Sequence, residues 1–220
     1  MHEPVDLTNA SFDDFVRFLF ERDIPDKSEK RRPWYFATEL HEIHFSADRI
    51  CGYYVQLFRQ PEFLLSRFTK AQLEEGFWAI MGPNLDFSAY RMIRDSELPM
   101  LARKDCIDSM ADLFKHLFAN EPLDTSVQMW WDSLCYDWHT GARKRERGGE
   151  DLELQDVFFQ TLAKVLSIES WICQSAALHG LGHLHHPRTT ELVDRFIVDH
   201  PSLTIEQKQY AIAAAKFKVM

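Results

Sequence analysis

The stretch at residues 171–186, WICQSAALHGLGHLHH, decides how this chain of 220 residues can fold. Its apolar residues recur with the spacing of a buried helix, and Pro187, which follows at once, cannot continue that helix. Four of the ten histidines of the chain lie in the same stretch. It therefore predicts a tightly packed helix, and it leaves two functions open, a binding scaffold or a metal site.

Helical periodicity extends over nearly the whole chain. Three capping boxes mark the starts of helices: Ser11 with Asp14, Thr69 with Gln72, and Thr204 with Gln207. Residues 34–45, WYFATELHEIHF, are ambiguous, and their neighbours favour a helix there as well. The chain has only eight glycines, which is few for a β-protein with many tight turns. We expect an all-α fold, either a stack of helical hairpins or an irregular bundle of about ten helices.

One polar segment interrupts this pattern. Residues 141–150, GARKRERGGE, combine charges with a Gly-Gly pair, as a mobile loop or a boundary does. We therefore expect an N-terminal helical region at residues 1–140, a flexible loop at 141–150, and C-terminal helical hairpins at 151–220. The two helical regions are expected to form one compact molecule.

The C-terminal region resembles HEAT-type helical repeats. The resemblance lies in the small residues of AALHGLGHL at 176–184, in Pro187, in the apolar positions of the next helix, and in the alanines at 213–215. Small residues let neighbouring helices approach closely. The resemblance covers about a third of the chain and implies a protein-binding scaffold, without indicating a ligand.

Composition excludes several classes of function. The formal net charge is −9 and the pI is near 5.5, whereas a nucleic-acid-binding protein usually presents a basic stripe. No apolar run reaches the roughly 18 residues that a membrane span needs. No secretory signal is visible, and the four cysteines lack CxxC spacing, so we expect free thiols in a cytoplasmic protein.

The first functional hypothesis is a protein interaction module without catalysis. The chain carries no nucleophile elbow, phosphate-binding loop or dinucleotide-binding motif, and no carboxylate pair is placed as an acid and base. Its acidity suits a basic protein partner, as in a bacterial immunity or adaptor-type protein. The candidate partner-binding residues are Trp130, which lies off the apolar stripe of its helix, and the nearby Asp132 and Asp137. This hypothesis requires no cofactor.

The second hypothesis is a metal-binding protein or a metal-dependent enzyme. His179 and His183 stand at i and i+4 on one helix and can share a divalent transition metal. His186 extends the stripe, but it precedes proline and leaves the α conformation. His41 and His44 could add ligands if the fold brings them close. The competing interpretation of this stripe is a solvated or interfacial polar face.

Two glycines in the same helix test the packing. At 100° per residue, Gly180 falls near the edge of the apolar stripe, where a neighbouring helix would cross. Gly182 falls nearer the outer side. We therefore expect a bulky residue to be harmful at 180, and alanine to be neutral or slightly stabilising at 182.

Overall fold

The computed structural model describes residues 5–24, 32–36 and 43–219, and these residues form an all-α protein. Two strands of two residues each are the exception, and they pair in parallel. The elements are β1 (Val5–Asp6), α1 (Phe12–Phe20), β2 (Ile43–His44), α2 (Ala47–Arg59), α3 (Leu64–Arg67), α4 (Lys70–Met81), α5 (Ala89–Arg94), α6 (Met100–Leu113), α7 (Ser126–His139), α8 (Gly149–Leu166), α9 (Trp171–Leu184), α10 (Thr189–Asp199) and α11 (Ile205–Ala215). The described residues thus contain eleven α-helices, close to the expected ten. All three predicted capping boxes are present.

The chain folds as two compact units, residues 1–109 and 110–220. The division falls inside α6, earlier in the chain than the polar segment at 141–150. That segment belongs to the C-terminal unit, where Arg143 holds it with ion pairs to three carboxylates: Asp137, Glu150 and Asp151. α7 therefore shares a unit with the helices that follow it.

In the N-terminal unit, α1 packs on α4 through aromatic side chains. Phe20 meets Phe77 edge-on, with ring centroids 5.2 Å apart. Gly76 makes this contact possible, since a Cβ at that position would lie 2.3 Å from a ring carbon of Phe20. Phe15, on the same helix, packs edge-on against the buried Tyr54 of α2.

The helix expected at residues 34–45 does not form. Residues Trp34–Phe36 form a short 3-10 turn, and β2 (Ile43–His44) is a strand, while residues 37–42 lie outside the described part of the chain. The strand forms because β1 provides a partner for it, and the Leu7 N–H donates to the His44 carbonyl at 2.7 Å. A tertiary pairing of this kind overrides local helical preference.

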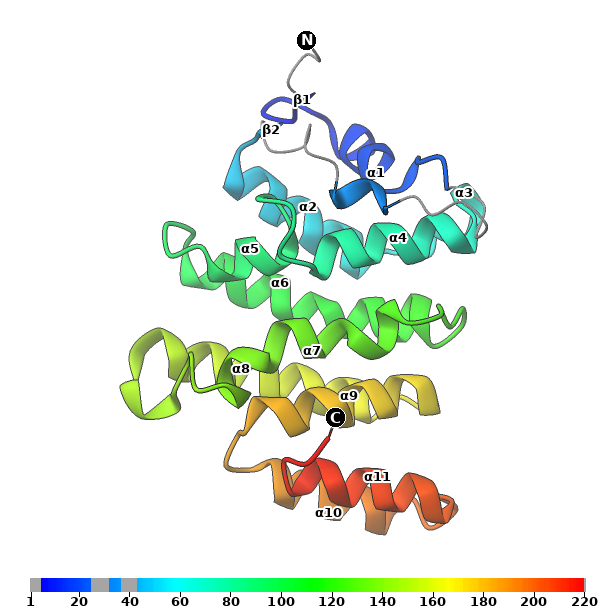
Figure 1. Ribbon diagram of the computed structural model, residues 1–220, viewed down its shortest axis with the longest axis vertical. Helices are drawn as coiled ribbons and strands as arrows, with labels where there is room; N and C mark the ends of the chain where they lie inside the picture. Colours follow the sequence, from blue (N-terminus) through cyan, green and yellow to red (C-terminus); the bar gives the residue numbers. More distant parts are fainter. Residues whose placement is uncertain (1–4, 25–31, 37–42, 220) are drawn as a thin grey trace. The chain divides into compact units, whose positions relative to one another are not determined.

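In the C-terminal unit, α9 is the central helix and packs against α7, α8 and α11 (Figure 1). A Cβ on Gly180 would lie 2.5 Å from the Trp131 Cβ of α7 and 2.8 Å from the Leu162 Cδ2 of α8. The close crossing expected at this glycine is confirmed. Glycine is required there because α7 and α8 both approach the α9 backbone.

Gly182 does not lie on an outer side. A Cβ there would lie 2.4 Å from the Cγ2 of Val219, so the C-terminal segment covers this position. A helical wheel gives Gly182 an outer side, but α9 has none, because buried residues lie on all its faces. The expectation that alanine is harmless at 182 is therefore wrong.

Two expectations from composition can be compared with the structure. The four cysteines, Cys51, Cys106, Cys135 and Cys173, are free and buried. Within the described ranges, no helix combines the length and the apolar character needed to cross a membrane.

Candidate metal centre

The site is built where α7 crosses α9. Asp132 directly follows Trp131, the residue that packs against Gly180, and His179 directly precedes that glycine. The crossing therefore brings a carboxylate of α7 beside the histidine stripe of α9. His183 lies one turn further along α9, on the same face as His179.

Three potential ligand atoms converge at this crossing. The Nε2 atom of His183 lies 3.1 Å from His179 Nε2 and 3.0 Å from Asp132 Oδ1, and His179 Nε2 lies 3.3 Å from the same oxygen. The histidine side chains are 10% and 4% exposed, and the aspartate is 29% exposed. The two nitrogens and the oxygen form a nearly equilateral triangle. The carboxylate is its most exposed member.

These spacings fit a single metal ion. With metal–ligand bonds of about 2.1 Å, ligand atoms about 3.0–3.3 Å apart subtend angles of about 90–105° at the ion. This range lies between octahedral and tetrahedral geometry. Imidazole nitrogen with one carboxylate oxygen is a ligand set of zinc(II) and iron(II) sites. Within the described ranges, Asp132, His179 and His183 form a group whose three ligand atoms lie close enough together to share one ion.

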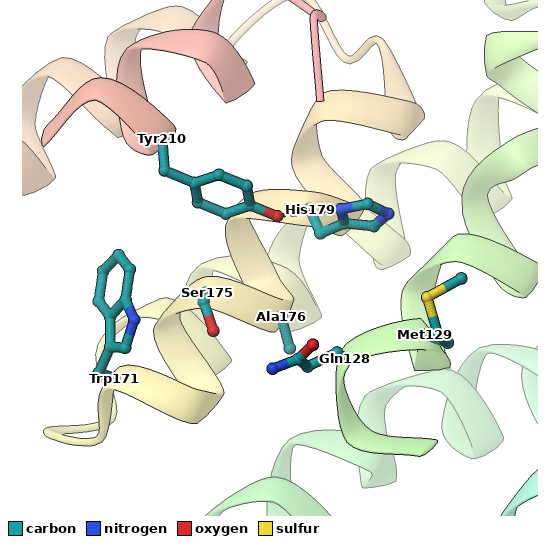
Figure 2. A pocket seen from close by; sticks show the side chains of 7 residues that line it. All are labelled: Gln128, Met129, Trp171, Ser175, Ala176, His179 and Tyr210. Carbon is teal, nitrogen blue, oxygen red and sulfur yellow. Dashed lines mark hydrogen bonds between the residues drawn. The ribbon is translucent and has the colours of Figure 1, made fainter. Parts of the chain in front are cut away.

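Tyr210 of α11 contacts one of the three potential ligands. Its Oη lies 3.0 Å from His179 Nδ1, and Figure 2 shows the phenol reaching from α11 toward the imidazole. Burial raises the pKa of Tyr210 to about 12, so the phenol stays neutral. If the imidazole donates its Nδ1–H to this oxygen, the lone pair of Nε2 stays free for a metal. Metal-bound histidines are commonly oriented by a hydrogen bond of this kind.

The two remaining potential ligands have different surroundings. Contact with His179, and then with His183, lowers the pKa of Asp132 far below its usual value, so this carboxylate is ionised. His183 Nδ1 is buried and has no hydrogen-bond partner among the residues that the structure describes. The ring of His183 is held by aromatic contacts instead, edge-on to Tyr136 and to His139.

A cavity of about 380 Å³ adjoins the cluster on the His179 side. It lies between α7, α9 and α11 and is mainly neutral, with amide, hydroxyl, phenol and indole groups (Figure 2). The lining residues are Gln128, Met129, Trp171, Ser175, Ala176, His179 and Tyr210. His179 thus belongs both to the ligand triangle and to the cavity wall.

The other histidines considered from the sequence lie elsewhere. His186 is buried against Phe159, with ring centroids 4.0 Å apart, and its Nε2 lies 3.1 Å from Asp156 Oδ1. It is not part of the triangle. His44 lies in β2 of the N-terminal unit and is not in the cluster, and His41 lies outside the described residues. The histidine stripe of α9 is packed inside the unit rather than solvated.

The candidate partner-binding residues are engaged within the protein. Trp130 is fully buried, and its indole N–H donates to the Met110 sulfur at 3.3 Å, so it is not the exposed tryptophan that the sequence allowed. Asp137 pairs with Arg143, and Asp132 faces the two histidines. Binding of a basic protein stays a prediction from the acidic composition.

The sequence offered His179 and His183 as candidate metal ligands under the second hypothesis, and Asp132 as a candidate for partner binding under the first. The missed signal is a second polar stripe. Asp132, Tyr136 and His139 stand at i, i+4 and i+7 on α7, which is the spacing of the histidine stripe on α9. Nothing in the sequence states that the two stripes face each other.

No family model, curated protein or solved structure matches the chain.

Proposed function

We propose that this protein binds a divalent transition metal ion, zinc(II) or iron(II), through Asp132 Oδ1, His179 Nε2 and His183 Nε2. The single observation that carries the proposal is the triangle of three ligand atoms, 3.0–3.3 Å apart. An ionised carboxylate and two imidazoles meet the charge and ligand preferences of such an ion. The phenol of Tyr210 supports the required orientation of His179.

The number of ligands favours a reactive ion over a structural one. Structural zinc sites are closed by four protein ligands, whereas catalytic sites have three and keep a position for water or substrate. An ion held by this triangle retains open positions, and it would supply a water of lowered pKa. We therefore propose a metal-dependent enzyme. Bound zinc would indicate hydrolytic chemistry, and bound iron would indicate a reaction that uses oxygen.

The cavity beside His179 indicates the kind of molecule that approaches the ion. Gln128 and Ser175 offer an amide and a hydroxyl, and Trp171 offers an indole face. With no lysine, arginine or carboxylate among the lining residues, this cavity suits a small uncharged polar molecule. His179 is shared by the cavity wall and the ligand triangle, so a molecule in the cavity would lie beside this ligand.

The test is the metal content of the protein, purified without a histidine tag and measured by elemental mass spectrometry. We expect close to one zinc or iron per chain. Asp132→Asn keeps the shape of the side chain but removes its charge, and should reduce the bound metal at least tenfold. His179→Ala with His183→Ala should remove it.

His200→Ala is the matched control, because His200 lies in the same unit and its Nδ1 is within 2.8 Å of the Phe196 carbonyl oxygen. This variant should retain the metal. Circular dichroism confirms that each variant is folded. If the folded double variant keeps the metal, or if metal-free wild type binds no added zinc or cobalt, the cluster is a hydrogen-bonded network and the proposal is rejected.

A further inference from the structure

A line of four histidine rings connects the surface to the candidate metal centre. Between neighbouring rings the centroids are 5.2 Å apart from His185 to His139, 4.9 Å from His139 to His183, and 4.6 Å from His183 to His179. The first two residues are exposed and the last two are buried. The proposed function uses only the buried half of this line.

The exposed half, His139 and His185, has the geometry of a second ligand pair and is called the outer pair below. His139 Nδ1 and His185 Nε2 lie 3.2 Å apart. This separation falls within the range between the ligand atoms of the buried triangle, and it suits two cis ligands with bonds of about 2.1 Å to one ion. The two residues lie at the ends of different helices: His139 is the last residue of α7, and His185 is the C-cap that follows α9.

Both rings are held in place by aromatic neighbours. The His139 ring stacks on Tyr136, with centroids 5.2 Å apart, and the His185 ring stacks on Phe217 at 4.6 Å. His185 also has a left-handed backbone, with φ 53° and ψ 31°. This is the conformation in which many helices end, and here it turns the His185 ring toward His139 and Phe217.

From this geometry we infer that His139 and His185 form a second, exchangeable site for a divalent transition metal ion, from which the buried triangle is loaded. The inference rests on the proposed function for its second half, the loading. Two imidazoles with exposed surroundings bind more weakly than three enclosed ligands, so the ion can leave. His183 contacts both His139 and His179, and is therefore placed to receive an ion from the outer pair.

The equilibrium test counts ions with cobalt(II), monitored by visible absorption and by calorimetry on metal-free protein. Wild type should bind two ions, one tightly and one at least tenfold more weakly. His139→Gln with His185→Asn removes the outer pair, and asparagine tolerates the left-handed backbone. This variant should bind only the tight ion, and Asp132→Asn with His183→Ala should bind only the weak one.

The kinetic test measures loading by stopped flow with zinc(II) and a chromophoric chelator. The outer-pair variant should load the triangle at least fivefold more slowly, a larger change than the change in its final affinity. His44→Ala, at an exposed histidine of the N-terminal unit, is the control and should load like wild type.

The outcomes separate the two ideas. If the outer-pair variant still binds two ions, or loads at the wild-type rate, the second site or its loading role is overturned while the metal centre stands. If Asp132→Asn with His183→Ala keeps both ions and the outer-pair variant loses one, the second site survives and the proposed function fails.

Discussion

His185 and Phe217 stack on each other, and they are the two residues other than glycine with positive φ in the described chain, at 53° and 57°. Their ring centroids are 4.6 Å apart and the planes are tilted by 24°. One residue ends α9, and the other follows α11. Two left-handed turns thus place two rings against each other beside the outer histidine pair.

This relationship predicts an unusual order of stabilities at position 185. His185→Gly and His185→Ala both lose the stacking, but only alanine pays about 1 kcal/mol for the left-handed backbone. The glycine variant should therefore be more stable than the alanine variant by about that amount. Urea unfolding of metal-free protein checks this, and equal midpoints would show that residue 185 has another conformation in solution.

The helix crossing predicts a difference between Gly180 and Gly182. At Gly180→Ala the new methyl group meets Trp131 and Leu162 in the core, so we expect a loss of about 1–3 kcal/mol, and a larger one for leucine. At Gly182→Ala the methyl meets the side chain of a single residue, Val219, rather than two neighbouring helices. Its loss should be smaller. Thermal melts compare the two variants, and equal losses would contradict the argument.

Tyr210→Phe tests the orientation of His179. Removing the phenol oxygen leaves His179 Nδ1 without this partner, and loss of a second-layer partner typically weakens a metal site by about 10–100-fold. Competition with a chelator of known zinc affinity measures the change. Tyr136→Phe is the control, because the exposed Tyr136 contacts His183 through its ring, which phenylalanine keeps. An unchanged zinc affinity in Tyr210→Phe would show that the phenol does not support metal binding.

His186 predicts how stability depends on pH. Burial lowers the pKa of His186 below its ordinary value of 6.5, against the opposing effect of Asp156. His186 therefore binds a proton more readily in the unfolded chain than in the folded protein. The free energy of unfolding should fall as the pH drops below about 6.5. His186→Gln should show a flatter dependence between pH 7 and 5 in urea unfolding. An identical slope would mean that His186 does not titrate in this window.

The local features of the fold could be predicted because their causes are local. The capping box of Thr69 and Gln72 and the stop at Pro187 depend on residues within a few positions. Ile43 and His44 could not be assigned, because their strand exists only through pairing with Val5 and Asp6.

The site shows the same division. The spacing of His179 and His183 follows from the helix alone. The contribution of Asp132 depends on the crossing of α7 over Gly180, which sequence periodicity does not contain. Trp130 was misplaced for a related reason: Met110 lies across from it and encloses its indole. A helical wheel with one apolar stripe assumes that a helix packs against one surface, whereas these helices pack against several.

The position of Asp132, 47 residues before His179, has a consequence for folding. His179 and His183 can hold an ion on one helix, but only Asp132 ties that ion to a distant part of the chain. An ion bound by all three would close a long loop, as a disulfide does, which is worth about 4 kcal/mol in a chain-entropy model. In Asp132→Asn the ion would still find two nitrogens, yet it would no longer cross-link the protein.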